Sequence, residues 1–519
     1  MQSPGYNAAA WLVDRHVEAG DGHRPAVVGG AERWSYDDLL AQVWRVQNAL
    51  AALGVRRTER VALVADDTPA TLAWILGALR SGVVPVPLST MATAADLGVL
   101  VADGVCTAVV VGAGYAAHLP AIRSLAPDMR AAVVLGDESD ESDGGDEGAV
   151  GWAALDDAGE APVAATTADS PGLWLASSGT TGQPKLVMHR QGALQATADG
   201  FGASVLGLRA DDVFLSASKL FFAYGLGTSL TFPLAAGGTS VLCAARTTVG
   251  AFAPLVAAER PTVVALVPSF VALLVAEEGL PAGALGSLRV ATSAGEVLPA
   301  ELHRRFSERF GVPLLDGIGA TEALNTFLSN RRGEERPGTS GRPVDGYEAR
   351  LVTEDGEAVT APDTPALLQV RGPSLATGYW SRWAATQAAF RGEWLQTGDI
   401  YECSADGYWT ARGRGSDMIK AGGIWVSPLE VEGVLVAHES VQEAAVVGAR
   451  DEQGLEMVVA VVVPRPGATI DAAAIEAHCR ERMAAFKRPR RVLAVAELPK
   501  TATGKVRRYL LRERLAEPD

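Results

Sequence analysis

The sequence predicts an α/β protein with a large N-terminal domain and a small C-terminal α/β domain. The chain has 519 residues, more than one hydrophobic core supports, so at least two domains are expected. Short apolar runs alternate with segments of helical periodicity, which is typical of α/β folds. Near residue 414 the chain becomes rich in glycine and charge and its elements become shorter, so we expect domains at 1–414 and 415–519.

The N-terminal region shows the alternation first. Ser35 begins a predicted helix as its cap, with Asp38 three residues later, and apolar residues then recur at helical spacing as far as Leu50. Strand-like runs at 61–64 and 83–88 flank a helix-like segment at 68–79. The acidic run 137–147 contains no apolar residue and can bury nothing, so we expect a solvated, mobile loop. A cation-binding run is the alternative.

The alternation continues through the middle of the chain and into the C-terminal domain. Strands are predicted at 263–267, 288–291, 444–447, 457–463 and 492–495, and helices at 270–276, 300–310, 428–436 and 472–483. The helix at 300–310 places Leu302, Phe306 and Phe310 on one face. Because residues just after strand ends form the crevice of a parallel α/β sheet, we expect 293–296, 316–322 and 397–399 to meet there.

Composition excludes several classes of partner and location. The net charge of −16 argues against nucleic acid or an anionic membrane as partner of the whole molecule. The four cysteines lie far apart and form no CxxC pair, so they predict free thiols in a reducing cytoplasm. We find neither a leader pattern at the N-terminus nor a bilayer-spanning apolar stretch, and therefore expect a soluble cytoplasmic protein.

A glycine- and hydroxyl-rich stretch, Ser177 to Lys185, follows the apolar run 173–176. Gly179 and Gly182 permit backbone conformations that turn successive amides towards one anion, and the hydroxyls and the lysine add donors and charge. Pro184 precedes the lysine, so this is not a Walker A loop, in which Gly-Lys-Ser/Thr opens a helix. The stretch indicates a phosphate site, and a flexible surface turn of the same composition is the alternative.

The last part of the chain is basic although the whole is acidic. Its basic residues have few acidic neighbours in the sequence and are Lys487, Arg488, Arg490, Arg491, Lys500, Lys505, Arg507 and Arg508. This pattern indicates a site for a polyanionic ligand, with a solvated helix face as the alternative.

Five segments occur in the order and approximate spacing of the adenylate-forming superfamily, which the chain resembles from about Trp34 to Arg512. They are Ser177 to Lys185, Gly317 to Glu322, Thr397 to Asp399, Gly413 to Gly423 and Pro499 to Lys505. One such segment is weak evidence, whereas five in order are strong. The superfamily includes acyl-CoA and aryl-CoA synthetases, nonribosomal peptide adenylation domains and beetle luciferases. The resemblance implies the adenylate-forming enzyme fold, in which a large N-terminal α/β domain of several subdomains is followed by a small mobile C-terminal α+β domain.

The resemblance implies a site for ATP and Mg²⁺. Thr180 and Thr181 would hold the β- and γ-phosphates, and Thr321 would contact the α-phosphate. Glu322 would bind Mg²⁺, a hard cation that carboxylate oxygen suits. Lys505 would place its ammonium between the substrate carboxylate and the α-phosphate, where negative charge concentrates during the reaction. The catalytic residues implied are Lys505, Thr321, Glu322 and Lys420.

The implied nucleotide site draws on segments far apart in the sequence. Asp399 and Arg414 would contact the ribose, and residues 316–319 with Glu296 would flank adenine. Taken singly, each of three residues favours a structural role, with Asp399 capping a turn, Glu322 on a solvated face and Lys505 as a surface lysine. Their joint placement favours the functional interpretation instead. The complete implied set is Ser177, Ser178, Gly179, Thr180, Thr181, Gly182, Lys185, Glu296, Asp316, Gly317, Ile318, Gly319, Asp399 and Arg414.

The resemblance also implies a second half-reaction in which a thiol displaces AMP from the acyl adenylate. In this superfamily the small domain rotates after Arg414 between the two steps, so that Lys505 serves the first and the face carrying Lys420 serves the second. Ser416 stands at the hinge, where Asp or Lys is common. The implied CoA-binding residues are Gly422, Gly423 and Lys487.

The segments 219–227, 293–296 and 317–330 resemble benzoate-CoA ligases in particular. Small residues would leave room for a flat ring, and Tyr224 would pack beside it. Phe221 and Phe222 have core packing as their alternative. The implied aryl-binding residues are Ala223, Tyr224, Ala294, Gly295, Ile318 and Asn325, and Asn325 stands where these ligases have histidine.

The function expected from the sequence is therefore ligation of benzoate or a related aryl acid to CoA, with ATP, Mg²⁺ and CoA as cofactors and a monomer or homodimer as the assembly. The basic C-terminal residues suit the phosphates of CoA. The nearest alternative is transfer of the aryl group to a separate acyl carrier protein. A nucleotide-binding regulatory protein without turnover is the alternative from another class.

Overall fold

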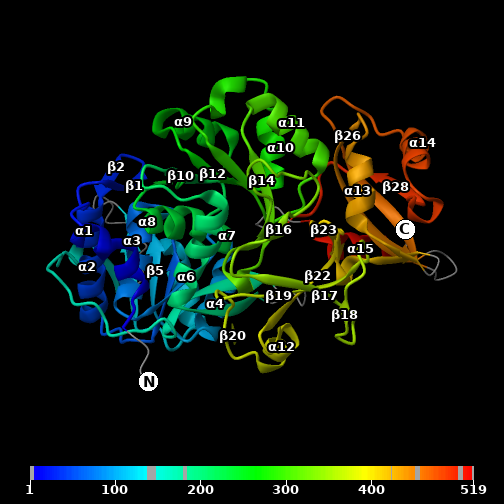
Figure 1. The fold of residues 1–519 in the computed structure, drawn as a ribbon. Helices are drawn as coiled ribbons and strands as arrows, with labels where there is room; N and C mark the ends of the chain where they lie inside the picture. Colours follow the sequence, from blue (N-terminus) through cyan, green and yellow to red (C-terminus); the bar gives the residue numbers. More distant parts are fainter. Residues whose placement is uncertain are drawn as a thin grey trace.

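The computed structural model describes residues 5–136, 148–178, 184–421, 424–450, 456–500 and 506–516. The acidic run 137–147 thus lies outside the described residues. A large N-terminal part contains most of the sheets, and a smaller C-terminal part, coloured orange to red in Figure 1, lies beside it. The predicted α/β fold with a large and a small domain is confirmed.

The first sheet of the N-terminal part is parallel, with strand order β4-β3-β5-β6-β7. Its strands are β3 (Arg60–Val64), β4 (Val84–Pro87), β5 (Cys106–Gly112), β6 (Ala131–Leu135) and β7 (Ala149–Gly151), and its helices include α2 (Tyr36–Ala52), α3 (Pro69–Arg80), α4 (Ala94–Asp103) and α5 (Leu119–Leu125). Ser35 caps α2 in a full capping box with Asp38, as predicted. The predicted strands and helix between 61 and 88 are confirmed.

The second sheet has nine strands in the order β16-β15-β14-β13-β12-β10-β11-β1-β2. They are β1 (Pro25–Gly29), β2 (Glu32–Ser35), β10 (Val213–Ser216), β11 (Thr239–Leu242), β12 (Val263–Leu266), β13 (Val290–Ser293), β14 (Leu314–Gly319), β15 (Thr326–Ser329) and β16 (Arg342–Pro343). The six central strands are parallel, and at the edges β2 pairs antiparallel with β1, β15 with β14 and β16 with β15. The carboxyl ends of the parallel strands therefore meet along one edge.

Helices accompany this sheet, including α1 (Arg15–Glu18), α6 (Gly192–Thr197), α7 (Ala223–Leu226), α8 (Phe232–Ala236), α9 (Val249–Glu259), α10 (Pro268–Ala276) and α11 (Ala300–Phe310). The predicted bounds of α11 are confirmed, and Phe306 and Phe310 are buried. The strand predicted at 288–291 begins instead at Val290. The amide of Leu288 donates to the carbonyl of Leu285 at 3.0 Å, so the apolar Leu288 belongs to a turn.

Two antiparallel sheets complete the N-terminal part. One has the order β20-β9-β8, and the other has β18-β17-β19-β22-β21 with β23 beside β22. Their strands are β8 (Pro171–Ser178), β9 (Pro184–Arg190), β17 (Glu348–Val352), β18 (Ala358–Val359), β19 (Ala366–Arg371), β20 (Gly378–Tyr379), β21 (Phe390–Arg391), β22 (Trp394–Cys403) and β23 (Trp409–Arg414), with helix α12 at Trp383–Ala389.

The C-terminal part has its own hydrophobic core, to which Ile419, Val431, Val446 and Ile475 contribute. Its elements are β24 (Ile419–Ala421), β25 (Ile424–Val426), α13 (Pro428–Val436), β26 (Val441–Arg450), β27 (Glu456–Pro464), α14 (Ala472–Arg482), β28 (Arg491–Ala494) and α15 (Arg508–Ala516). The predicted bounds of α13 are confirmed, and α14 ends one residue early.

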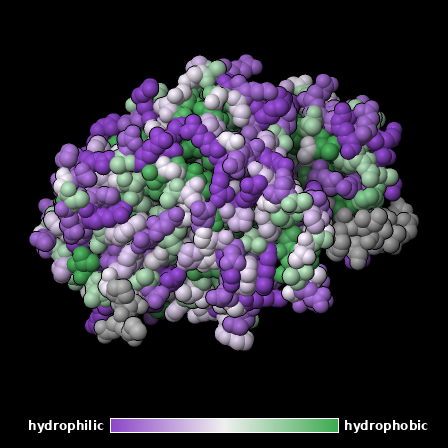
Figure 2. Space-filling model, viewed as in Figure 1, coloured by the Kyte–Doolittle hydropathy of each residue, from purple (hydrophilic) through white to green (hydrophobic). Residues whose placement is uncertain are grey.

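Hydrophilic residues cover much of the face in Figure 2, and hydrophobic residues gather there in smaller patches. Within the described ranges, the helices are all too short or too polar to cross a bilayer. All four cysteines are free thiols.

Candidate active site

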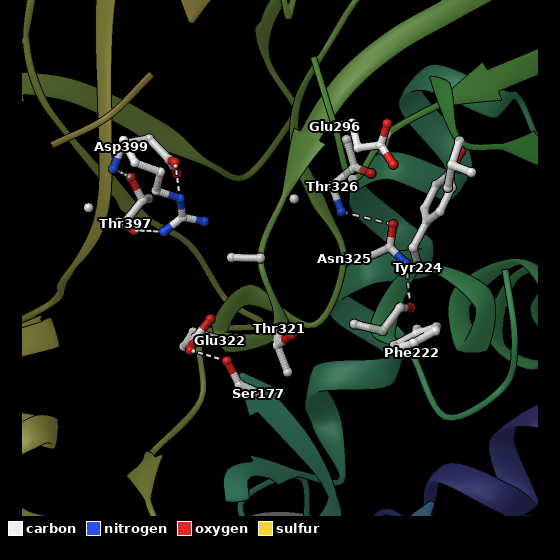
Figure 3. Close-up of a pocket in the computed structure, with 18 of the residues that line it drawn as sticks. Ser177, Phe222, Tyr224, Glu296, Thr321, Glu322, Asn325, Thr326, Thr397 and Asp399 are labelled. Atoms are coloured by element: carbon white, nitrogen blue, oxygen red, sulfur yellow. Dashed lines mark hydrogen bonds and ion pairs between the residues drawn. The ribbon is translucent and has the colours of Figure 1, made fainter. Parts of the chain in front are cut away.

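A cavity of about 1510 Å³ opens where the carboxyl ends of the nine-stranded sheet face the two antiparallel sheets. Residues 217–219 after β10, 294–296 after β13 and 319–322 at the end of β14 line it. Asp399 on β22 lies on its opposite side (Figure 3), and Arg414 at the end of β23 lines the cavity next to Asp399. Parts of the three segments predicted to meet thus line one cavity, although 397–399 lie within the antiparallel strand β22 rather than just after a parallel strand.

Glu322 lies in a single helical turn, Thr321–Ala323, directly after β14. Its Oε1 accepts hydrogen bonds from the hydroxyl of Tyr379 at 2.8 Å and from Ser177 Oγ at 3.2 Å. The backbone of the turn is also anchored, because His189 Nε2 donates to the carbonyl of Thr321 at 2.8 Å. Side chain and backbone of this turn are therefore both fixed against the sheet β20-β9-β8.

Two of these anchoring groups have displaced pKa values. Burial lowers the pKa of His189 from 6.5 to about 4, so the ring is neutral and its Nε2 carries the proton that bonds Thr321. Burial and the neighbouring Glu322 raise the pKa of Tyr379 above its usual value, so the hydroxyl remains a donor.

The predicted phosphate stretch joins two antiparallel strands. Ser177 on β8 pairs in register with Lys185 on β9, and both line the cavity. Lys185 Nζ lies 5.0 Å from the centre of the Tyr379 ring. A Walker A loop leads instead from a strand into a helix, so the strand on each side agrees with the exclusion of that motif. Of the other predicted residues, Ser178 ends β8, and Gly179, Thr180, Thr181 and Gly182 lie outside the described residues.

Asp399 and Arg414 face each other across β22 and β23. Asp399 Oδ1 and Arg414 Nε are 2.8 Å apart, and Arg414 Nη1 donates to the carbonyl of Thr397 at 3.1 Å. The amide of Asp399 in turn donates to Thr397 Oγ1 at 3.1 Å. A carboxylate and a guanidinium are thus held at the cavity wall, where they offer an acceptor and donors to a polyhydroxylated ligand.

Tyr224 and Asn325 lie together on the other side of the cavity (Figure 3). The Tyr224 hydroxyl and Thr292 Oγ1 are 2.6 Å apart. Asn325 Nδ2 donates to the carbonyl of Ala223 at 3.1 Å, and its Oδ1 accepts from the amide of Thr326 at 2.8 Å. Both polar side chains are therefore engaged by the protein, which leaves mainly apolar surface towards the cavity.

The remaining lining of this region is small or aromatic. Ala223, Ala294 and Gly295 line the cavity, and Gly295 has a φ of +94°, which L side chains rarely adopt. Phe221 and Phe222 also line it, with ring centres 4.6 Å apart, although Phe221 is largely buried. The segment following β10 therefore gives the cavity an aromatic wall.

Three predicted binding residues are not among the described lining of this cavity. They are Asp316, Gly317 and Ile318, whereas Gly319 and Glu296 belong to the lining. Asp316 is 5% exposed, and burial raises its pKa well above the usual range. A side chain at Gly317 would meet the carbonyl of Leu328 on the neighbouring strand β15, and Ile318 is half-buried and packs against the core. Their part in binding stays a prediction.

The structure describes only some of the predicted residues of the C-terminal part. Lys487 is ion-paired with Glu430, at 2.5 Å, and is not among the described lining residues. Ser416 lies in the helical turn Gly415–Asp417, and Lys420 lies on β24. Gly422, Gly423 and Lys505 fall outside the described residues.

In the fold, basic residues of the C-terminal part pair with acidic residues that are distant from them in the sequence. Lys500 pairs with Glu443 at 2.7 Å, and Arg508 pairs with Glu432 at 2.7 Å. These acids come from α13 and β26, which the fold brings alongside, so part of the basic character is neutralised locally.

Tyr379 and His189 are site residues that the sequence did not reveal. Each bonds the turn that carries Thr321 and Glu322 from a strand of another sheet. A lone histidine in a strand and a tyrosine after glycine carry no distinctive signal. Their importance follows from the pairing of β20 with β9.

A magnesium ion suits this donor set. The described residues contain no group of three or more His, Cys, Asp or Glu that could enclose a metal. Mg²⁺ is usually held by one or two carboxylates together with substrate phosphates and water, rather than by an all-protein cage. A single anchored carboxylate, Glu322, beside the predicted phosphate stretch fits that pattern.

Comparison with known proteins identifies homologues that match this chain over almost its whole length. Residues 13–380 match the family described as AMP-binding enzyme, and residues 430–505 match the AMP-binding enzyme C-terminal domain. A benzoate-CoA ligase of Thauera aromatica is 40% identical over 513 residues, which cover 98% of this chain and 96% of that protein.

Solved structures are similar over the same extent. A benzoate CoA ligase from Burkholderia xenovorans LB400 has a TM-score of 0.89 at 38% identity, covering 98% of this chain and 100% of that one. The anthranilate CoA ligase AuaEII in complex with anthranoyl-AMP has a TM-score of 0.93 at 34% identity, covering 98% and 97% of the two chains.

Proposed function

The chain belongs to the AMP-binding enzymes, and we propose that it is an AMP-forming ligase that joins benzoate or a related aryl acid to coenzyme A. The observation that carries this proposal is the layout of one cavity. Asp399 lies at one side, Tyr224 and Asn325 lie at the other, and Thr321 and Glu322 lie between them (Figure 3). A nucleotide at the first side and an aryl acid at the second would place the carboxylate against the α-phosphate.

The first half-reaction would form the aryl adenylate. A carboxylate oxygen of the acid attacks the α-phosphorus of ATP, and the bond from that phosphorus to the bridging oxygen of pyrophosphate breaks. Ser177, Lys185 and the intervening loop would hold the departing pyrophosphate, and Thr321 would contact the α-phosphate. Lys505 would lower the barrier by neutralising charge that develops at the reacting oxygens.

The proposed metal ligand is Glu322. Bound there, Mg²⁺ would neutralise phosphate charge and so favour attack by an anionic carboxylate. The protein's own contribution is to hold Glu322 in place through Tyr379 and Ser177.

The second half-reaction would transfer the aryl group to sulfur. The CoA thiolate attacks the carbonyl carbon, the bond to the AMP oxygen breaks, and the thioester and AMP are released. We place the domain boundary after Arg414, with Ser416 at the hinge and Lys420, Gly422 and Gly423 on the face that serves this step. Lys487 would assist CoA only in competition with Glu430.

CoA is favoured as the acceptor because three relatives that are 37–40% identical to this chain are named as CoA ligases. By their names, those relatives act on benzoate, 4-hydroxybenzoate or 3-hydroxybenzoate. We therefore propose benzoate and its simple ring-substituted forms as the substrates of this chain, with the preferred substituent set by the surroundings of Tyr224 and Asn325.

The test is exchange of labelled pyrophosphate into ATP across a panel of substituted benzoates. We expect acid-dependent exchange, and its absence with every benzoate would reject aryl-acid activation. AMP release with CoA is then compared with release with a phosphopantetheinylated carrier protein. A thioester formed on the carrier but not on CoA would assign the acceptor to the carrier.

A further inference from the structure

We propose that Tyr379 is a positioning residue that orients Glu322, holding one carboxylate oxygen so that the other is presented to Mg²⁺. This inference rests on the proposed function, because it concerns the metal that accompanies ATP. Both hydrogen bonds to the Glu322 side chain, from Tyr379 and from Ser177, end on Oε1. Within the described ranges, Oε2 makes neither a hydrogen bond nor an ion pair, and Glu322 lines the cavity.

The backbone around Glu322 leaves its side chain little freedom. The carbonyl of Thr321 accepts from His189, and the carbonyl of Glu322 accepts from the amide of Ala376 at 2.8 Å. With the main chain anchored on both sides, the two hydroxyls fix the last torsions of the side chain. The rotamer entropy of the glutamate is thus lost during folding rather than when the ligand binds.

Tyr379 is itself held firmly enough to act as a support. Its strand β20 pairs with β9, with Tyr379 opposite Val187. Its ring meets Phe390 edge-on with centres 5.8 Å apart, and its other interactions reach Lys185 and Glu322. The Tyr379 side chain therefore contacts two groups of opposite charge. Its hydroxyl donates to the carboxylate of Glu322, and its ring faces the ammonium of Lys185.

These two contacts can be separated by substitution. Tyr379→Phe removes the hydroxyl and retains the ring beside Lys185, whereas Tyr379→Leu removes both. If the hydroxyl positions Glu322, the phenylalanine variant should lose affinity for the magnesium complex of ATP and retain affinity for ATP without the metal. The leucine variant should weaken both, because Lys185 also loses its aromatic neighbour.

The measurement is calorimetric binding of MgATP, and of ATP with EDTA, to the full-length chain. For Tyr379→Phe we expect MgATP affinity to fall about tenfold, as befits one lost hydrogen bond to a charged group, with unchanged affinity in EDTA. In the Glu322→Gln background the same substitution should add no further loss. Tyr36→Phe removes another buried hydroxyl bond, to the carbonyl of Gly238 at 2.9 Å, and should alter neither affinity.

Three results would overturn the positioning role. If Tyr379→Phe loses equal affinity for ATP with and without magnesium, the hydroxyl acts on the nucleotide or on the fold rather than through the metal. If neither affinity changes, Ser177 alone is sufficient to hold Glu322. Equal affinity of the wild type for ATP with and without magnesium would contradict the inference that Glu322 holds a magnesium ion. Loss of benzoate-dependent exchange alone, with the magnesium-specific effect intact, would instead reject the proposed substrate and leave this inference standing.

Discussion

Asp399 and Arg414 form an ion pair between neighbouring strands, with 2.8 Å separating Oδ1 from Nε. The arginine also donates to the carbonyl of Thr397, so both partners are fixed to the same sheet. The Asp399 side chain is only 14% exposed, whereas that of Arg414 is 47% exposed. The carboxylate is consequently the more rigid of the two, and we expect it to dominate nucleotide recognition at this side of the cavity.

Asp399→Asn should raise the KM for ATP with a smaller effect on kcat. The amide retains an acceptor but loses the charge that strengthens a bond to a ribose hydroxyl, a loss of about 1.5–3 kcal/mol or roughly ten- to hundredfold in affinity. ATP dependence of pyrophosphate exchange measures this effect. Asp406→Asn is the matched control, because Asp406 makes an exposed pair with Arg336 in the turn after β22, and an equal rise there would contradict the assignment.

Asn325→Ala should destabilise the protein as well as impair binding of the aryl acid. Asn325 is 3% exposed and bonds the carbonyl of Ala223 and the amide of Thr326. Leaving these buried groups unpaired should lower the free energy of unfolding by about 2 kcal/mol, and loosening of Ala223 and Tyr224 should lower kcat/KM for benzoate. Urea unfolding and pyrophosphate exchange measure the two effects.

Asn48→Ala provides the control for Asn325. Asn48 also donates to two backbone carbonyls, those of Asp157 and Gly159, but in an exposed setting. Its removal should cost about 0.5 kcal/mol or less. Equal losses in the two variants would indicate that burial does not govern the effect.

The features predicted well from the sequence are those encoded within a few residues. The capping box at Ser35 and the bounds of α11 and α13 depend on side chains three or four positions apart. Likewise, Pro184 before Lys185 excluded a Walker A loop, and the strands on each side of the stretch agree with that exclusion, whereas the phosphate site itself stays a prediction.

The features missed depend on pairing between distant segments. Tyr379 reaches Glu322 because β20 pairs with β9, nearly two hundred residues away, and Arg508 pairs with Glu432 because α15 and α13 both pack on β26. The burial of Asp316 also depends on distant segments. It lies on β14, between β13 and β15 in the sheet, and the motif alone does not show that this residue is only 5% exposed.

His189 should make stability depend on pH. Its folded-state pKa of about 4 lies below the ordinary value of 6.5, so the unfolded chain binds the proton more readily. The contribution of the neutral ring is fully present above pH 6.5 and is lost as the pH falls towards 4, amounting to about 3 kcal/mol over that interval.

His189→Gln should flatten this dependence, because an amide can donate to Thr321 without titrating. Urea unfolding between pH 4 and pH 7 measures the slope for the wild type and the variant. His23→Gln, at an exposed histidine, should leave the wild-type slope unchanged. A slope retained in His189→Gln would assign the acid sensitivity to other groups.

The proposed hinge segment after Arg414 is anchored at both ends. Arg414 is paired with Asp399 of β22, and Asp417 is paired with Arg512 of α15 at 3.1 Å. Gly415 and Ser416 lie between these anchors, so rotation of the small domain is expected to require changes of their backbone angles.

Ser416→Pro should therefore impair the two half-reactions unequally. Proline fixes φ and opposes the change of backbone angle that rotation requires, so we expect thioester formation to slow about tenfold, which corresponds to about 1.4 kcal/mol. Adenylation precedes the rotation and should be retained. Single-turnover pyrophosphate release and consumption of preformed aryl adenylate by CoA measure the steps separately. Ser416→Ala retains backbone freedom and should behave as the wild type in both, whereas equal losses in the two steps of Ser416→Pro would contradict a hinge at this position.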